Sequence, residues 1–375
     1  MEPDGLRRAC FISSPALWRR GFGGKHPLKP ERLARTVALL EAYQAFAAPN
    51  VIRVEPRMAT DEEVTLFHTQ DYVDAVRALS AGETPGQAVA RYGFGPGDNP
   101  VFRGMYESSG LKSGGGIRGA EMLMAGECDV AFNFSGGLHH AHPSQASGFC
   151  IFNDAAIAIH WLVREGARVV YVDIDAHHGD GVQEAFYDSD RVLTISLHQD
   201  GNTLFPGSGF VNDMGVGAGK GYSVNVPLPP YTDDETYLWA FDQIVPPLVR
   251  TFSPDVLVSQ LGVDTHYGDP LANLALTTRG HQALYAAFSE LAPARWLACG
   301  GGGYNLDVVP RSWTLAFGVM SGQTFPDEIP ASYREQYGGH WLHDREVPSI
   351  SEAVRSRIRH RVEETIRALQ KQYDL

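Results

Sequence analysis

The chain has 375 residues, of which 43% are hydrophobic and only 20% are charged. This composition is typical of a globular protein with a sizeable core and excludes a disordered chain. The 44 acidic residues outnumber the 31 basic ones and give a net charge of −13. Because phosphate contacts require clustered cations, we expect no nucleic-acid partner and no anionic membrane surface.

The cysteines lie far apart and form no CxxC pair; they are Cys10, Cys128, Cys150 and Cys299. This spacing indicates free thiols in a reducing compartment rather than a disulfide framework or a zinc ribbon. The first residues lack the apolar run of a signal peptide, and no segment reaches 18 consecutive apolar residues. We therefore expect a cytoplasmic protein, whose oligomeric state the sequence leaves open.

Short apolar segments predict six strands. In chain order they cover 8–13, 129–134, 168–174, 191–197, 255–261 and 295–299. The clearest of them are nearly continuous apolar runs rather than alternating ones. Such runs are typical of strands that are buried on both faces of a parallel sheet.

Helical patterns lie between these strands. One helix is predicted to begin near Pro30 and to extend to about residue 46, and others cover 110–126 and 154–165. From about residue 350, a charged helix is expected to pack on the outside. Capping-box spacing marks three helix starts, at Thr60 with Glu63, Thr232 with Glu235 and Ser349 with Glu352.

The alternation of strands and helices predicts an α/β fold. We expect a single doubly wound domain over residues 1–375, with a mainly parallel central sheet flanked by helices and a C-terminal helical extension from about 325. Four loops are rich in Gly and Pro and long enough to indicate function rather than simple connection. They cover 80–100, 136–149, 199–221 and 262–273.

Polar clusters follow four of the predicted strands. They are SGGLHHAHPSQASGF at 135–149, DIDAHHGDG at 173–181, GVDTHYGDP at 262–270 and GGGGYN at 300–305. In an open α/β sheet, ligands bind at the carboxyl ends of the strands. His, Asp and Tyr residues at the same end of several strands therefore predict one shared site.

Asp175 and His177 are two residues apart, so they share a face if both leave an extended strand end, and Asp173 joins them there. With Asp264 from a neighbouring strand they form an Asp/His/Asp metal site. Three protein ligands leave one position open, which is the pattern of a catalytic metal rather than a structural one. Zinc and ferrous iron both suit this ligand set. The alternative is a solvated turn with capping aspartates.

His139 and His140 are suited to acid–base chemistry. Each ring can donate one N–H to a carboxylate, which fixes the tautomer and leaves the other nitrogen free. Asp173 and Asp180 are the candidate orienting carboxylates. The alternative is a pair of loop histidines without catalytic function. The weaker candidates, expected to be supporting or surface residues, are His142, His178 and His266.

Tyr304 follows four consecutive glycines, which allow its backbone to approach a ligand closely. Its hydroxyl could donate a hydrogen bond to a developing oxyanion, although a tyrosine of the core is the alternative. A phosphate-binding loop is excluded because no Lys-Ser/Thr follows the glycines. The loop aromatics Phe149 and Phe205 could form the walls of a slot for an alkyl chain, or pack beneath a loop.

These residues resemble the zinc-dependent histone deacetylase family and, within it, the bacterial acetoin-utilisation-type deacetylases. The resemblance covers most of the chain, through HPLKPERL, GPGDNPVF, GGLHHAHPSQASGFCIFND, VDIDAHHGDGVQEAFY, ISLHQ, YSVNVPL, GVDTHYGDPLANLALT and GGGGYN. It implies an arginase-like α/β fold, with zinc on Asp175, His177 and Asp264.

The resemblance also implies residue roles. His140 would act as general base and acid with His139 assisting, Asp180 and Asp173 would support the pair, and Tyr304 would polarise the amide carbonyl. Substrate contacts are implied for Asp98, Gly148, Phe149, Phe205, Leu271 and Gly302. One structural potassium site is implied at Asp173, Asp175, His177, Ser196 and Leu197, and another at Phe186, Ser189, Val192 and Tyr222.

Three positions depart from the family pattern. Leu271 stands where many nuclear members carry Met, while Pro143 and Tyr267 lie where they would alter the entrance and substrate choice. The expected activity is metal-dependent hydrolysis of an N-acyl amide, with N6-acetyl-lysine in a protein or peptide as substrate. An acetylpolyamine or other small amide is the alternative.

Two other classes of function remain as hypotheses. A binuclear manganese ureohydrolase on the related fold would need a second carboxylate two residues beyond Asp264, where this chain has His266. A metal-bearing binding module without turnover is the other. The expected cofactors are Zn²⁺, with Fe²⁺ as the alternative, and structural K⁺.

Overall fold

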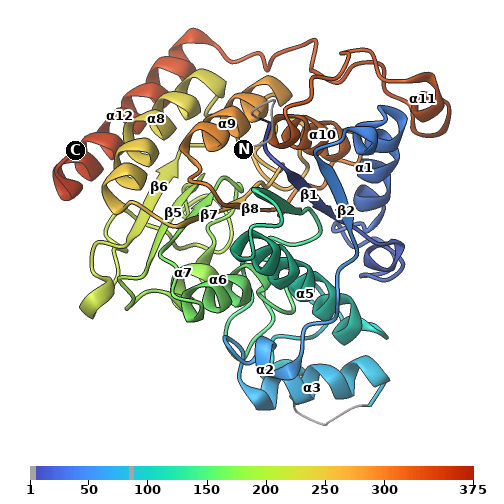
Figure 1. Ribbon diagram of the computed structural model, residues 1–375. Coiled ribbons are helices and arrows are strands. Elements are labelled where there is room, and N and C mark those ends of the chain that lie inside the picture. Colours follow the sequence, from blue (N-terminus) through green and yellow to red (C-terminus); the bar gives the residue numbers. More distant parts are fainter. Residues whose placement is uncertain (1–5, 84–87) are drawn as a thin grey trace.

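Eight short strands form the centre of the molecule (Figure 1). They are β1 (Ala9–Ile12), β2 (Val51–Val54), β3 (Val130–Asn133), β4 (Val169–Asp173), β5 (Val192–Gln199), β6 (Ser223–Leu228), β7 (Val256–Gln260) and β8 (Trp296–Cys299). The computed structural model describes residues 6–83 and 88–375. All paired strands run parallel, in the order β2-β1-β3-β8-β7-β4-β5-β6, which confirms the predicted single α/β domain.

Burial on both faces explains the continuous apolar strand sequences. In β4, Val170 and Val172 belong to the core on one side of the sheet, whereas Val169 and Tyr171 belong to the core on the other side. Successive side chains of a strand point to opposite faces. A strand covered on both sides therefore needs apolar residues at every position.

The edge strands β2 and β6 were not among the six predicted strands. β2 (VIRV) is partly exposed along its length, and β6 (SVNVPL) contains polar residues and Pro227. Each has only one neighbouring strand. An edge strand tolerates polar residues and a proline, which lacks an N–H, so its sequence carries a weaker strand signal.

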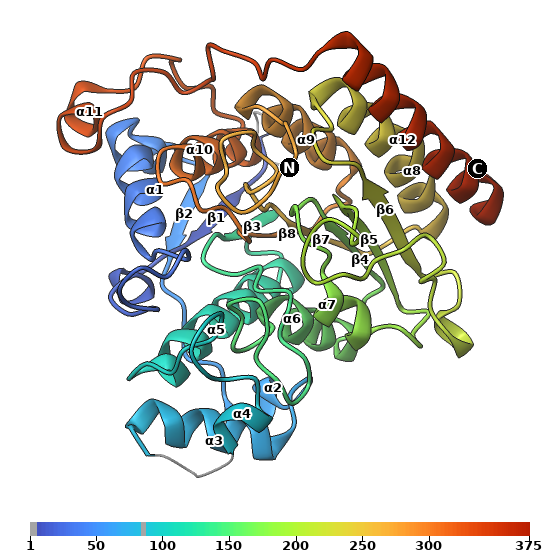
Figure 2. The same ribbon diagram turned by 180° about the vertical axis from the view of Figure 1, so that it is seen from behind.

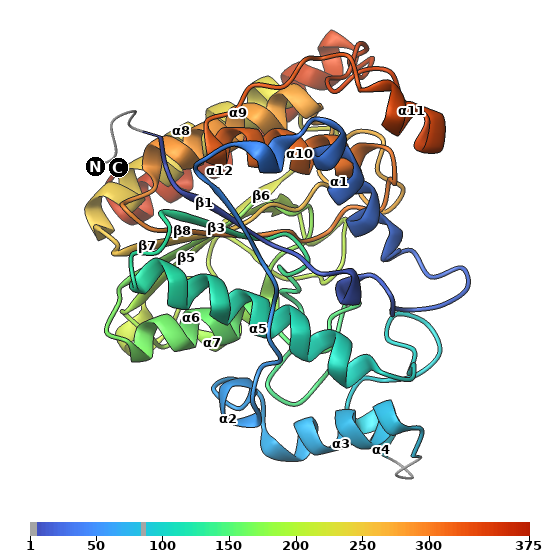
Figure 3. The same ribbon diagram turned by 45° about the vertical axis from the view of Figure 1, so that its right-hand side comes forward.

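Helices cover both faces of the sheet. They are α1 (Glu31–Ala42), α2 (Asp61–Val64), α3 (Gln70–Ala81), α4 (Ala88–Arg91), α5 (Met105–Met124), α6 (Asp154–Arg164), α7 (Asp180–Ala185), α8 (Asp234–Phe252), α9 (Thr278–Leu291), α10 (Val308–Ser321), α11 (Ala331–Tyr337) and α12 (Glu352–Tyr373). Figures 2 and 3 show α5, α6 and α7 on one face, and α1, α8, α9 and α10 on the other. The helix α12 packs outside, on α8.

The three predicted helix starts had different outcomes. The capping box at Thr60 and Glu63 is present, although it begins a helix of a single turn. The other two predictions were wrong. Asp233 caps α8, because its carboxylate reaches the N–H of Thr236, whereas the Thr232 hydroxyl donates to the carbonyl of Pro229. The third helix begins two residues later than predicted, with Ser351 rather than Ser349 as its cap.

The glycine-rich helix α5 begins at Met105, earlier than the predicted residue 110. Its glycines permit close packing against neighbouring segments: a Cβ on Gly114 would lie 1.9 Å from the carbonyl oxygen of Arg57. In the loop predicted over 80–100, residues 84–87 lie outside the described residues and α4 occupies 88–91. In the described part of the chain, no helix is both long and apolar enough to span a bilayer.

Candidate active site

The carboxyl ends of four adjacent central strands converge on one site. The segment after β3 carries His139 and His140, and the segment after β4 carries Asp175 and His177. The segments after β7 and β8 carry the third carboxylate and the glycine run, with Asp264 and Tyr304. Parallel pairing in the order β3-β8-β7-β4 brings these segments together, because all four strands end on the same side of the sheet.

Asp175, His177 and Asp264 form a buried cluster with metal-ligand geometry. Nδ1 of His177 lies 3.1 Å from Oδ1 of Asp175 and 3.0 Å from Oδ2 of Asp264. One ligand atom from each residue falls within 4.8 Å of the other two. Three ligands of this kind can hold a transition metal and leave a coordination position for another molecule.

Hydrogen bonds from neighbouring groups orient the two carboxylates. Oδ2 of Asp175 accepts from Nε2 of Gln260 and from the N–H of Gly302, both at 2.7 Å. Oδ1 of Asp264 accepts from the N–H of Ala176 at 2.8 Å. A Cβ on Gly302 would lie 2.0 Å from Oδ2 of Asp264, so only glycine fits beside both carboxylates. These contacts leave the remaining carboxylate oxygens directed at His177.

The electrostatics of the cluster suit a divalent cation. Burial and the charge of Asp175 raise the pKa of Asp264 to about 6. Burial disfavours the charged form of His177, but Asp175 and Asp264 outweigh it and raise the pKa of that imidazole to about 10. Two carboxylates therefore compete for one proton on the imidazole. A divalent cation would replace that proton and neutralise both acids, so these residues fit a metal.

The two adjacent histidines each contact their own carboxylate. Nδ1 of His139 lies 2.7 Å from Oδ2 of Asp173, and Nδ1 of His140 lies 2.7 Å from Oδ1 of Asp180. The hydroxyl of Tyr171 also donates to Asp173, at 2.7 Å. With both Nδ1 atoms engaged, the two Nε2 atoms face each other at 3.1 Å. The carboxylates thus fix the tautomer and the orientation of each ring, as expected for histidines that act in acid–base chemistry.

Opposite surroundings separate the pKa values of the two imidazoles. Burial disfavours charge on His139, but the charges of Asp173 and Asp175 outweigh it and raise its pKa to about 9. Burial and the charge of His139 lower the pKa of His140 to about 4, against the effect of Asp180. Groups with separated pKa values can take separate acid and base roles. His140 is then neutral, and its Nε2 lone pair faces the protonated Nε2 of His139.

Tyr304 lies at the wall of the cavity that contains the histidines. Gly302 and Phe149 also line this cavity, and the Phe149 and Tyr304 rings meet edge to face at 5.7 Å. The N–H of Tyr304 donates to Oδ2 of Asp269 at 2.8 Å. Within the described residues its hydroxyl has no hydrogen-bond partner. Burial raises the pKa of Tyr304 well above its usual value, so the phenol keeps its proton.

The loop residues Gly148 and Phe149 both have positive φ, of 49° and 69°. A Cβ on Gly148 would lie 2.4 Å from Cδ2 of His140 and 2.9 Å from Cε1 of Phe205, so glycine permits these close approaches. Phe205 is exposed, and its ring lies 5.0 Å from the His140 ring. Phe205 therefore lies against His140, and Phe149 lines the same cavity as His140. A slot between the two aromatic rings stays a prediction.

Two other predicted contact residues reach the site through neighbours. The exposed Asp98 places its carbonyl oxygen 3.0 Å from Nε2 of His26, whose ring meets Phe149 edge to face. The partly buried Leu271 donates its N–H to Oδ1 of Asp269, the carboxylate that also holds Tyr304. Both contacts to substrate stay predictions.

The three remaining histidines of the polar clusters turn to other partners. His142 pairs with Glu184 at 2.5 Å and lies 3.6 Å from Asp180. His178 contacts Ser208 and Gln183. His266 pairs with Asp344 at 2.9 Å, although a second metal in a ureohydrolase would need a ligand at this position.

The residues of the two predicted potassium sites cluster around β5. Asp173 is the ladder partner of Ser196, and the carbonyl of Tyr222 accepts from the N–H of Thr194. The second set spans the end of α7 and the start of β5, with Phe186, Ser189 and Val192. Potassium binding at either set stays a prediction.

Sequence reasoning gave no role to three buried residues that hold the site, although Asp269 lies in one of the predicted polar clusters. Gln260 orients Asp175, and Asp269 fixes both Tyr304 and Leu271. Arg32 donates to the carbonyl of Gly303 at 3.0 Å and lies over the Trp313 ring. The sequence does carry a signal for Arg32, because this charged residue lies on the mainly apolar buried face of α1.

Comparison with known proteins identifies the family of the chain. Residues 26–320 match the model of the histone deacetylase domain. The chain is 41% identical over 334 residues to the acetoin utilization protein AcuC of Bacillus subtilis, covering 88% of this chain and 86% of that protein. It is 38% identical to the histone deacetylase RPD3 of Saccharomyces cerevisiae, covering 90% of this chain and 78% of that one.

Solved structures agree with this result. A histone deacetylase homologue from Aquifex aeolicus superposes with a TM-score of 0.86 at 31% identity, covering 97% of this chain and all of that one. A homologue in complex with SAHA superposes with a TM-score of 0.88 at 32% identity and the same coverage. The resemblance predicted from the sequence is thus confirmed, and the chain belongs to the histone deacetylase family.

Proposed function

We propose that this protein is a zinc-dependent deacetylase that hydrolyses the amide of N6-acetyl-lysine. The observation that carries the proposal is one cavity in which a buried Asp/His/Asp cluster lies beside a neutral imidazole and an unpartnered phenol. Those groups are a metal site, a general base and an oxyanion donor. Family membership supports hydrolysis of an acyl amide.

Asp175, His177 and Asp264 would hold the metal, with ferrous iron as the alternative to zinc. When bound there, the metal supplies Lewis acidity for a carbonyl oxygen and lowers the pKa of water. Gln260 and Gly302 keep Asp175 oriented for binding. The proposed potassium sites around β5 would support the loop after β4, which carries Asp175 and His177.

The protein groups move the protons. His140 accepts a proton from the attacking water on Nε2, while Asp180 stabilises the imidazolium that forms. Tyr304 donates to the carbonyl oxygen as negative charge develops there. The imidazolium of His140 then gives this proton to the leaving lysine amine. The charged imidazole of His139 lies next to His140 during this transfer. The products are a free amine and a carboxylate.

The shape and charge of the entrance favour a lysine side chain. Phe205 lies against the His140 ring and Phe149 lines the cavity that contains His140, and these apolar rings suit a linear alkyl chain. Asp98 is exposed near this entrance and would attract the backbone or amine of the substrate. A carboxylate at the entrance also suits acetylated polyamines. The test therefore compares acetyl-lysine peptides with acetylated polyamines.

The test is hydrolysis by zinc-loaded protein of an acetyl-lysine peptide and of acetylated polyamines, assayed side by side. We expect turnover of the peptide with a higher kcat/KM than any polyamine, and loss of turnover in Asp264→Ala. Glu290→Ala, which removes a surface carboxylate on α9, is the control and should retain activity. Absence of peptide turnover by fully loaded enzyme would overturn the proposal.

A further inference from the structure

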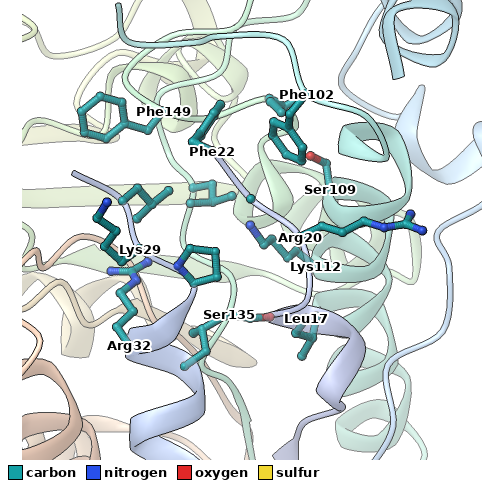
Figure 4. Close-up of a pocket in the computed structure, with 16 residues that line it drawn as sticks. Leu17, Arg20, Phe22, Lys29, Arg32, Phe102, Ser109, Lys112, Ser135 and Phe149 are labelled. Atoms are coloured by element: carbon teal, nitrogen blue, oxygen red, sulfur yellow. The ribbon is translucent and has the colours of Figure 1, made fainter. Parts of the chain in front are cut away.

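A second cavity lies directly behind the candidate active site. It lies between α1 and α5 (Figure 4). Leu28, Leu138 and Phe149 line both this cavity and the one containing His140. A group that passes these three side chains therefore moves from one cavity to the other.

The charge of this cavity is one-sided. Its described lining contains four basic residues and no Asp or Glu, in a chain whose net charge is −13. Two of the four turn to other partners: Arg20 lies 4.0 Å from Glu107, and Nζ of Lys29 donates to the carbonyl of Gly24 at the surface. The other two, Arg32 and Lys112, remain without a carboxylate partner within 4.0 Å in the described chain.

Arg32 and Lys112 approach the cavity from opposite walls. Arg32, on α1, is buried, and within the described residues its guanidinium donates only to the carbonyl of Gly303, next to the glycine that orients Asp175. Lys112, on α5, makes no hydrogen bond through Nζ to any described residue. Burial, together with repulsion from Arg32, lowers the pKa of Lys112 to about 8. Figure 4 shows the Lys112 side chain extending among the residues of the cavity.

Arg32 is buried and Lys112 is partly buried, and neither contacts a carboxylate in the described chain. Asp264 and Asp175 favour the charge of Arg32 only from beyond contact distance, so both cations lack a direct counter-charge at the cavity. A buried charge is usually paired, because its desolvation must be offset by an opposite charge and by hydrogen bonds. A carboxylate offers both, since it accepts from an ammonium and from a guanidinium at once. The apolar side chains between the two cavities would contact the methylene groups that precede such a carboxylate.

We propose that this cavity binds the terminal carboxylate of a dicarboxylic acyl group on lysine, such as succinyl. Lys112 and Arg32 would form the ion pairs with that carboxylate. The inference rests on the proposed amide hydrolysis and names an acyl class for it. Arg32 reaches Gly303 beside the metal cluster, so the cavity lies where an acyl group extends beyond its scissile carbonyl. Hydrolysis breaks the C–N bond; water adds hydroxyl to the acyl carbon and a proton to the amine.

The first test compares succinyl-lysine with butyryl-lysine in the same peptide, since the two acyl groups have four carbons and differ in the terminal carboxylate. We expect the wild type to have a higher kcat/KM for succinyl. Lys112→Met should lower the succinyl-to-butyryl ratio by about 10- to 100-fold, the usual size of a lost hydrogen bond to a charged group. Lys220→Met removes an exposed lysine that lines neither cavity and should leave the ratio unchanged.

Binding provides a readout independent of turnover. In a His140→Ala background, which slows hydrolysis, calorimetry should give tighter binding of the succinyl peptide than of the butyryl peptide. Adding Lys112→Met should remove that difference. Equal binding of the two peptides before and after the change would overturn the proposal.

The outcomes separate this proposal from the more general one. Turnover of acetyl- and butyryl-lysine without preference for succinyl would refute the carboxylate pocket and leave deacylation intact. Absence of turnover with every acyl-lysine would refute the deacylase itself. If Lys112→Met weakens inhibition by free acetate but leaves the succinyl-to-butyryl ratio unchanged, the cavity holds a released carboxylate and the acyl-class proposal is wrong.

Discussion

At the scale of single residues, His139 and His140 are neighbours in sequence with opposite electrostatic environments. Asp173 and Asp175 favour the charged form of His139, whereas burial and the charge of His139 keep His140 neutral. Each Nδ1 contacts one carboxylate at 2.7 Å, Asp173 or Asp180, so the difference arises from the additional charge of Asp175 near His139 and from the charge of His139 itself. Two identical side chains thus become suited to different proton-transfer roles.

Replacing His140 with Ala should lower kcat by about 10²- to 10⁴-fold, the range for a positioned acid–base group. The metal should remain, because His140 is outside the Asp175, His177 and Asp264 cluster. Steady-state kinetics with parallel metal analysis checks both points. His360→Ala removes an exposed imidazole on α12 and is the matched control. Near-normal turnover of metal-loaded His140→Ala would require a different base.

Replacing Tyr304 with Phe should lower kcat by about 10²- to 10³-fold with a much smaller change in KM, because the hydroxyl acts on charge that develops in the transition state. The melting temperature should barely change, since the hydroxyl has no partner among the described residues to lose. Kinetics and melting curves on one preparation decide the matter. Early unfolding, or a change confined to KM, would make Tyr304 a structural residue.

At the scale of elements, the strands in the middle of the sheet could be predicted and the edge strands could not. Burial on both faces makes β4 and β7 apolar over most of their length, and this pattern can be recognised in the sequence alone. Edge strands and helix caps depend on neighbours that the local sequence does not specify. The same limit applies to the site: the ligands follow strand ends, whereas Gln260 and Asp269 act only through contacts formed on folding.

The loop after β8 should be intolerant of any side chain at its third glycine. Gly302→Ala places a Cβ against Oδ2 of Asp264 and Asp175, at 2.0 and 2.7 Å, so the carboxylates must move. We expect metal affinity to fall at least about tenfold, as for changes to groups that orient metal ligands. Titration with a competing chelator measures this. Gly23→Ala, where a Cβ would meet no atom within 4 Å, is the control; equal affinities would contradict the account.

The outer helix α12 contributes stability without contributing to the chemistry. Its buried residues Ile358, Val362, Ile366 and Leu369 face the core beside α8. Ile366→Ala should lower the free energy of unfolding by about 2–5 kcal/mol, the usual range for a buried Ile-to-Ala change. Denaturant melts measure it, with the more exposed Val354→Ala as control. If Ile366→Ala lowered the free energy of unfolding by less than Val354→Ala does, α12 would not stabilise the core.

At the scale of the whole molecule, the parallel sheet brings charged residues together at the carboxyl ends of its central strands. The site groups follow the central strands β3, β8, β7 and β4, which lie side by side although they are far apart in sequence. The acidic cluster at these strand ends and the acid-free cavity behind it lie in one acidic chain. Charge is therefore segregated inside the fold, in a way that the net charge of −13 does not reveal.

The central claim is that Asp175, His177 and Asp264 hold one metal ion that hydrolysis requires. The most direct test adds zinc stepwise to chelator-stripped protein and follows acetyl-lysine hydrolysis against zinc bound per chain. The account predicts no activity without metal and a plateau at one bound zinc, with neither binding nor activity in Asp264→Ala. Full turnover by metal-free protein, or a plateau that requires two metal ions per chain, would contradict it.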